Sequence, residues 1–264
     1  MTKITLSLLS LVALSAIATA DEFTTTDVEA KYSNNKSVEA TSNLEQSLNA
    51  GFSSTTGNTK TLNVNGKYEA AFITTGYNNH DLKTAFDISA FMTKNNSVKE
   101  NEEYTANLGL EQMLDNGWLG YAGVNWLRNP DFKNYDNKFA IGVGVGKELF
   151  KDATQSLVAK LGTSYNIEQY ANTQPDEDFG ALNEYLEYNN KLNNVSRLFF
   201  KIGSMQNFDD MRKDYEVTGV FGVNFAVGEN VSLSIEEEVA YDNLPSAGLD
   251  KTDTKSIVRV GYAF

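Results

Sequence analysis

The sequence of 264 residues contains no cysteine, one histidine and three prolines. The absence of cysteine excludes a small disulfide-stabilised domain and zinc sites built on thiolates. The single histidine, His80, lies in the polar segment 77–81, where a solvated turn residue is expected rather than a catalytic base. Proline-rich linkers and low-complexity tracts are also absent, so we expect one domain.

Positive charge is scarce as well, with 22 Lys and Arg against 35 Asp and Glu and a net charge of −13. Such an acidic chain is a poor binder of nucleic acid, which is therefore excluded as an expected partner. Beyond residue 20 no apolar run reaches 18 residues. This absence excludes a helical membrane protein.

The N-terminus carries the pattern of a secretory signal peptide. Lys3 precedes apolar residues 4–17, and a small-residue cleavage site ends at Ala20. A membrane anchor is the alternative, but about 14 apolar residues are too few to span a hydrocarbon layer of about 30 Å. The expected organisation is a signal peptide over 1–20, a short periplasmic extension over 21–41 and an outer-membrane barrel over 42–264.

What the sequence does contain is a period of two residues. Over 62–72 the even positions are apolar or small and most odd positions are polar, and 157–166 and 215–225 repeat the alternation. This period is typical of strands with two different faces. We expect an all-β fold, a transmembrane antiparallel up-and-down β-barrel of about twelve strands. The expected strands are 42–54, 59–73, 81–94, 102–114, 117–128, 136–150, 155–169, 181–192, 195–206, 211–226, 230–242 and 254–264.

The strand lengths and connections favour a membrane barrel. Strands of about 11 to 15 residues are long for a soluble protein but fit a tilted crossing of the hydrocarbon layer. With both termini in the periplasm, brief connections such as 115–117 and 193–194 fall on the periplasmic side, and longer polar ones such as 171–180 and 243–253 fall outside.

Trp118 and Trp126 lie on the same face of one expected strand. Eight residues at about 3.3 Å span roughly 26 Å before tilt, which would place one aromatic ring near each membrane interface. Two core tryptophans in a soluble sandwich are the alternative interpretation.

The two ends of the expected barrel carry family resemblances. The last strand places Val258, Val260, Tyr262 and Phe264 on one face and resembles the C-terminal recognition strand that the barrel-assembly machinery handles. The segments Gly51–Thr59, Tyr241–Pro245, Lys251–Thr254 and Gly261–Phe264 resemble those of the salt-induced outer-membrane protein family (YdiY-like), a domain of unknown function. This resemblance implies a barrel in the outer membrane and an expression link to salt or envelope stress, and it supplies no catalytic residues.

Charged residues at mid-strand positions of the polar faces are expected to line the lumen. Seven acids face six bases, and such a mixed set can pair and plug a narrow barrel or line a path for small ions. Balanced charge disfavours a porin for acidic sugars, which would need a strongly basic track. The expected lumen residues are Lys67, Glu69, Lys83, Asp87, Glu111, Lys160, Glu187, Arg197, Lys201, Glu216, Glu236, Glu238 and Arg259.

Three acidic features need separate interpretation. The runs 176–178 and 209–210 lack the ordered ligand spacing of a calcium loop, and we interpret them as solvated loops that could bridge through divalent cations to lipopolysaccharide. Glu237 falls on an apolar face between Ile235 and Val239. Either a bulge shifts the register there or protein covers that face.

The sequence therefore predicts a non-enzymatic barrel in the outer membrane of a Gram-negative cell. It would act as a small-solute or ion channel or as a stress-linked structural protein, with no cofactor and no metal site. The expected partners are outer-membrane lipids, lipopolysaccharide and, during biogenesis, the barrel-assembly machinery, and a monomer is favoured. The alternatives are a barrel enzyme that modifies envelope lipids and a soluble periplasmic β-sandwich that binds ligands.

Overall fold

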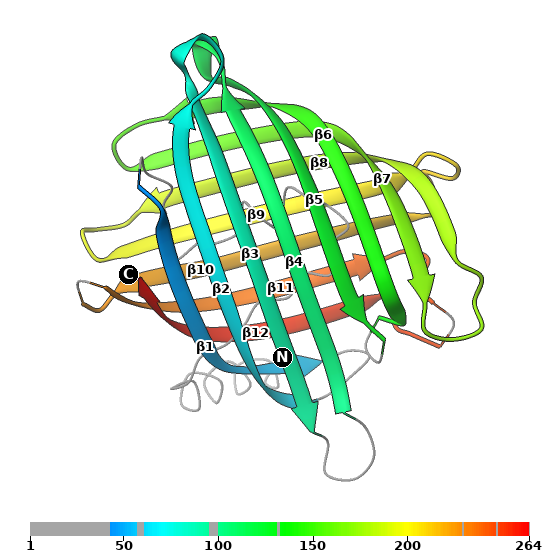
Figure 1. Cartoon of the computed structure of the whole chain (residues 1–264). Coiled ribbons are helices and arrows are strands. Elements are labelled where there is room, and N and C mark those ends of the chain that lie inside the picture. The colour runs from blue at the N-terminus through cyan, green and yellow to red at the C-terminus, as the bar shows by residue number, and fades with distance from the viewer. Residues whose placement is uncertain are drawn as a thin grey trace, which may run out of the picture.

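A computed structural model of the chain describes residues 43–56, 61–94, 100–130, 133–228, 230–246 and 248–263. The strands form one closed antiparallel barrel, shown in Figure 1, in which each strand pairs with its neighbours along the chain and the last pairs with the first. The strands are β1 (Glu45–Thr56), β2 (Thr61–Thr75), β3 (Asp81–Lys94), β4 (Glu100–Met113), β5 (Trp118–Asn129), β6 (Tyr135–Lys151), β7 (Gln155–Tyr170), β8 (Glu177–Lys191), β9 (Ser196–Asn207), β10 (Tyr215–Ala226), β11 (Val231–Asp242) and β12 (Thr252–Ala263).

The closing contact joins β1 to β12, whose register runs from Ser47 opposite Ala263 to Thr56 opposite Thr254. Closure leaves no unpaired sheet edge, which is a requirement for strands in lipid. The predicted up-and-down barrel of twelve strands is thus confirmed. The expected signal peptide (1–20) and extension (21–41) lie outside the described residues and stay predictions.

The two faces of the wall differ sharply in chemistry. On β7, Lys160, Ser164 and Glu168 are buried, whereas Leu161 and Ile167 between them are exposed. Among the described side chains the same contrast recurs on the other strands, so the outer surface is mainly apolar and the inner surface mainly polar. Exposed apolar residues on the outer face include Phe86, Ile88, Leu108, Leu110, Val124, Phe139, Ile141, Val143, Val145, Phe221, Ile235, Val239, Val260 and Tyr262.

Short connections gather at the end where the chain enters β1 and leaves β12. The β2–β3 and β4–β5 connections each contain a 3-10 turn, Tyr77–Asn79 and Asp115–Gly117. His80 follows the first turn, and its Nε2 lies 3.1 Å from Oδ1 of Asp115 in the second. The single histidine therefore joins two neighbouring turns. Among the described residues no helix has the length and apolar character needed to cross a bilayer.

The other end carries the longer connections 171–176, 208–214 and 243–251. The β7–β8 connection is shorter than expected, because residues 177–180, predicted as loop, continue the pairing with β7 up to Glu177 opposite Glu168. The ladder hydrogen bonds of β7 extend the strand here despite the low strand propensity of acidic residues.

Inward aromatic side chains lie against the wall where the neighbouring strands carry glycine. A Cβ added to Gly144 would lie 2.5 Å from both Cζ and the hydroxyl oxygen of Tyr121. The rings of Phe199 and Tyr121 similarly occupy the space that a Cβ would need at Gly222 and Gly162. Glycine at these positions allows bulky rings to lie close against the inner wall.

The structure excludes one of the two explanations for Glu237. The pairing of β11 with β10 and with β12 continues without a shift, so the bulge explanation is wrong. Glu237 is exposed on the outer face, where the Ser256 hydroxyl donates to its Oε2 at 2.6 Å. The described register shifts instead involve the pairings of β6 with β5 and β7.

Candidate functional site

The barrel interior gathers most of the expected lumen residues. Lys67, Glu69, Asp87, Glu111, Lys160, Lys201, Glu236 and Glu238 are buried, and Lys83, Glu187 and Glu216 are partly buried. Arg197 is exposed, because β9 begins at Ser196 and this position lies at the end of the barrel rather than in mid-strand. The side chain of Arg259 lies outside the described part, although its backbone pairs with Ser234 and Gly51.

One ion-pair group spans the β2–β3 wall. Lys67 Nζ lies 3.2 Å from Glu69 Oε1 and 3.4 Å from Asp87 Oδ1. Asp87 also accepts a hydrogen bond from Asn107, which in turn accepts one from Asn125. Charge and amide groups are thus linked from β2 to β5. Buried charges persist only when they are paired and hydrogen-bonded in this way.

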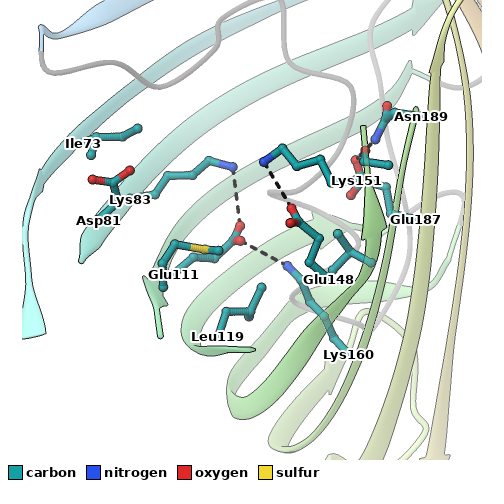
Figure 2. Close-up of a pocket in the computed structure, with 13 residues that line it drawn as sticks. Ile73, Asp81, Lys83, Glu111, Leu119, Glu148, Lys151, Lys160, Glu187 and Asn189 are labelled. Carbon is teal, nitrogen blue, oxygen red and sulfur yellow. Dashed lines mark hydrogen bonds and ion pairs between the residues drawn. The ribbon is translucent and has the colours of Figure 1, made fainter. Parts of the chain in front are cut away.

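At the end with the short turns, the interior opens into a cavity of about 350 Å³, here named the short-turn cavity (Figure 2). Glu111 stands between two lysines, at 3.6 Å from Lys83 Nζ and 3.5 Å from Lys160 Nζ, and Lys151 pairs with Glu148 at 3.1 Å. The cavity wall is therefore mixed in charge. Its lining is Ile73, Asp81, Lys83, Glu111, Met113, Leu119, Glu148, Lys151, Ser156, Val158, Lys160, Glu187 and Asn189.

A second cavity of about 250 Å³, the long-loop cavity, lies at the opposite end. Tyr135 and Tyr170 contribute rings whose centroids lie 5.6 Å apart. Beneath them Lys138 Nζ lies 2.5 Å from Glu168 Oε1 and 3.3 Å from Glu216 Oε1. The lining is Tyr135, Glu168, Tyr170, Gln174, Glu177, Phe179, Asp214, Glu216, Asp242, Leu244, Pro245 and Ser246.

Sequence reasoning missed Lys138 and Glu168, although the signal was present. Phe139 and Ile141 are exposed on the outer face, so two-residue alternation directs Lys138 inward. Lys160 faces inward, and Glu168 lies eight residues further along β7, so the same alternation directs Glu168 inward as well.

Polar side chains separate the two cavities, which share no lining residue among those described. On β7, Lys160 lines the short-turn cavity and Glu168 the long-loop cavity, and Ser164 faces inward between them. The Ser164 hydroxyl oxygen accepts hydrogen bonds from Asn166 at 3.0 Å and Asn183 at 2.8 Å. The interior between the cavities is therefore lined by polar side chains that can bind water.

The described residues contain no group of three or more His, Asp and Glu side chains placed to hold a metal ion. His80 contacts Asp115 in the short turns. The interior thus offers charge and hydrogen bonds for ions or polar solutes, and we identify no nucleophile with an adjacent base within the described part.

Comparisons with known proteins support the fold. A family model described as "Protein of unknown function, DUF481" matches residues 48–264. An outer-membrane channel from Pseudomonas putida F1 superposes with a TM-score of 0.54 at 11% identity, covering 92% of this chain and 100% of that one. The NanC porin gives 0.51 at 10% identity over 84% of this chain and 99% of that one.

An active-site mutant of the outer-membrane phospholipase A from Escherichia coli also matches, with a TM-score of 0.49 at 13% identity over 83% of this chain and 89% of that one. At such identities these likenesses concern the fold alone. The comparison with curated proteins found no match.

Proposed function

The chain belongs to DUF481, a family of proteins of unknown function, and on this premise we propose that it is an outer-membrane channel for small ions or solutes. The observation that carries the proposal is a charged, hydrogen-bonded interior with a cavity at each end. The likeness of the fold to an outer-membrane channel and to a porin supports it.

The outer face supports placement in a membrane. Exposed Phe86, Ile141, Val143 and Leu161 belong to a wall whose inner face carries buried lysines and carboxylates. In water this arrangement would expose the apolar face and bury the charged one, which is unfavourable on both counts. Lipid outside and water inside reverse both effects.

The proposal includes export and assembly as the sequence predicts them. The signal peptide would be cleaved after Ala20, and the barrel would meet lipopolysaccharide and other outer-membrane lipids. Val260 and Tyr262 are exposed on the outer face of β12, as an assembly signal read from outside would require, while Phe264 lies outside the described residues.

A plugged barrel with a structural role in a stressed envelope is the second candidate. The near-complete burial of the Lys67 and Lys138 side chains, 4% and 2% exposed, favours it because tightly paired groups leave little room for a solute. An enzyme that modifies envelope lipids receives less support, since the sequence has one histidine and that residue contacts Asp115 in a short turn.

The test is conductance of the mature protein reconstituted in planar bilayers. Discrete current steps that are absent from a mock preparation made without the protein are the expected result. A barrel that inserts into the bilayer but stays silent would overturn the channel and favour the plugged barrel. Recovery of the protein only from the soluble fraction of cells would overturn both candidates.

A further inference from the structure

The two cavities differ in charge. The short-turn cavity is lined by Lys83, Lys151 and Lys160 as well as by four acids, so its wall is nearly balanced. The long-loop cavity is lined by five carboxylates, and none of its described lining residues is basic. An ion that crosses the barrel therefore meets strongly unequal fields at the two mouths.

The floor of the long-loop cavity already holds an ammonium group. Lys138 Nζ lies between Glu168 and Glu216 and 4.6 Å from the centroid of the Tyr135 ring. Carboxylates together with an aromatic face are the groups that recognise ammonium ions in proteins. The Lys138 side chain thus shows, within the molecule, which kind of ion this wall stabilises.

The carboxylates nearer the mouth have neutral hydrogen-bond donors. Asp214 accepts from the Asn207 amide at 2.6 Å, and Asp242 accepts from the backbone N–H of Leu244 at 2.8 Å. Such donors orient a carboxylate without cancelling its charge. Burial is the main cause that raises the pKa of Asp214 above its usual value, so a cation entering the cavity would stabilise the ionised form.

We propose that the long-loop cavity is a cation-selecting vestibule, through which the channel admits small monovalent cations in preference to anions. The inference rests on the proposed channel function and adds the class of solute to it. Selection arises because Glu177, Asp214 and Asp242 raise the local concentration of cations at the mouth and repel anions before they reach the narrow interior.

The experiment measures the permeability ratio of potassium to chloride from reversal potentials in bilayers that separate unequal KCl solutions. In dilute salt we expect a ratio on the order of 10, since focused charge raises local ion concentration by about that factor or more. Near 1 M KCl the ratio should fall towards one, because screening acts within about 3 Å.

Two single variants of β8 form a matched pair. Glu177 is exposed and lines the vestibule, whereas Glu184 is exposed on the outer face, where the Ser204 hydroxyl donates to it. Glu177→Gln should lower the ratio about twofold to threefold in dilute salt, and Glu184→Gln should leave it unchanged. The triple variant Glu177→Gln, Asp214→Asn, Asp242→Asn should abolish the preference.

Current steps with equal or anion-favouring permeability would overturn the vestibule and leave the channel standing, and so would a Glu177→Gln variant that behaves as Glu184→Gln does. A silent bilayer would overturn the channel and the vestibule with it. Because Glu177 is exposed, the single variant keeps the test valid even if the triple variant fails to fold.

Discussion

At the residue scale, lysines and carboxylates inside the wall are held by paired contacts rather than by solvent. Lys67 has two acidic partners in the β2–β3 wall, and Lys138 has two beneath the long-loop cavity. Glycines make room for inward aromatic rings, because the Tyr121 ring occupies the space that a Cβ would need at Gly144 and Gly162 on the neighbouring strands. Glycine in these strands is therefore a packing requirement.

This requirement gives a prediction for Gly144. In Gly144→Ala the new methyl group would lie 2.5 Å from the Leu161 carbonyl oxygen and from Tyr121 Cζ, so we expect the free energy of unfolding to fall by about 1–3 kcal/mol. Gly120→Ala is the matched control, because nothing lies within 4 Å of its added Cβ. Denaturant unfolding in lipid vesicles measures both, and equal stability of the two variants would contradict the packing account.

At the element scale, the alternation of each strand decides which side chains meet lipid. β11 follows the rule with an unbroken register and, as a result, presents Glu237 outward between Ile235 and Val239. The sequence raised this conflict and left two explanations open, a bulge or a face covered by protein, and the unbroken register excludes the bulge. The Ser256 hydroxyl on β12 donates a hydrogen bond to the outward Glu237 carboxylate, which offsets part of the cost of this position.

The position of Glu237 leads to a second prediction. If lipid covers this face, Glu237→Leu should raise the free energy of unfolding in vesicles by roughly 1–2 kcal/mol, because a carboxylate is unfavourable near the bilayer midplane. Glu102→Leu is the control, since Glu102 lies near the end of β4, where the effect should be small. A large loss of stability in Glu237→Leu, or a changed oligomeric state, would indicate that protein covers the face instead.

At the scale of the whole molecule, the sequence predicted the closed barrel and most of its inward charges, since period, strand length and connection length depend on local residues. It could not predict which charges share a cavity, because Glu111 on β4 meets Lys160 on β7 across the interior, between strands that are not paired with each other. The excess of acid at one mouth was hidden for the same reason. A count of acidic and basic residues over all strands averages the charge at the two ends of the barrel.

The central claim, a barrel with lipid outside and a charged interior, is tested most directly by its two tryptophans. Trp118 and Trp126 are the only tryptophans of the sequence, and both lie on the outward face of β5, near its two ends. In vesicles of brominated phospholipid we expect quenching of both, measured separately in Trp118→Phe and Trp126→Phe. Bromine near the headgroups should quench more than bromine near the chain ends. Native folding without lipid, with neither tryptophan quenched, would contradict the account.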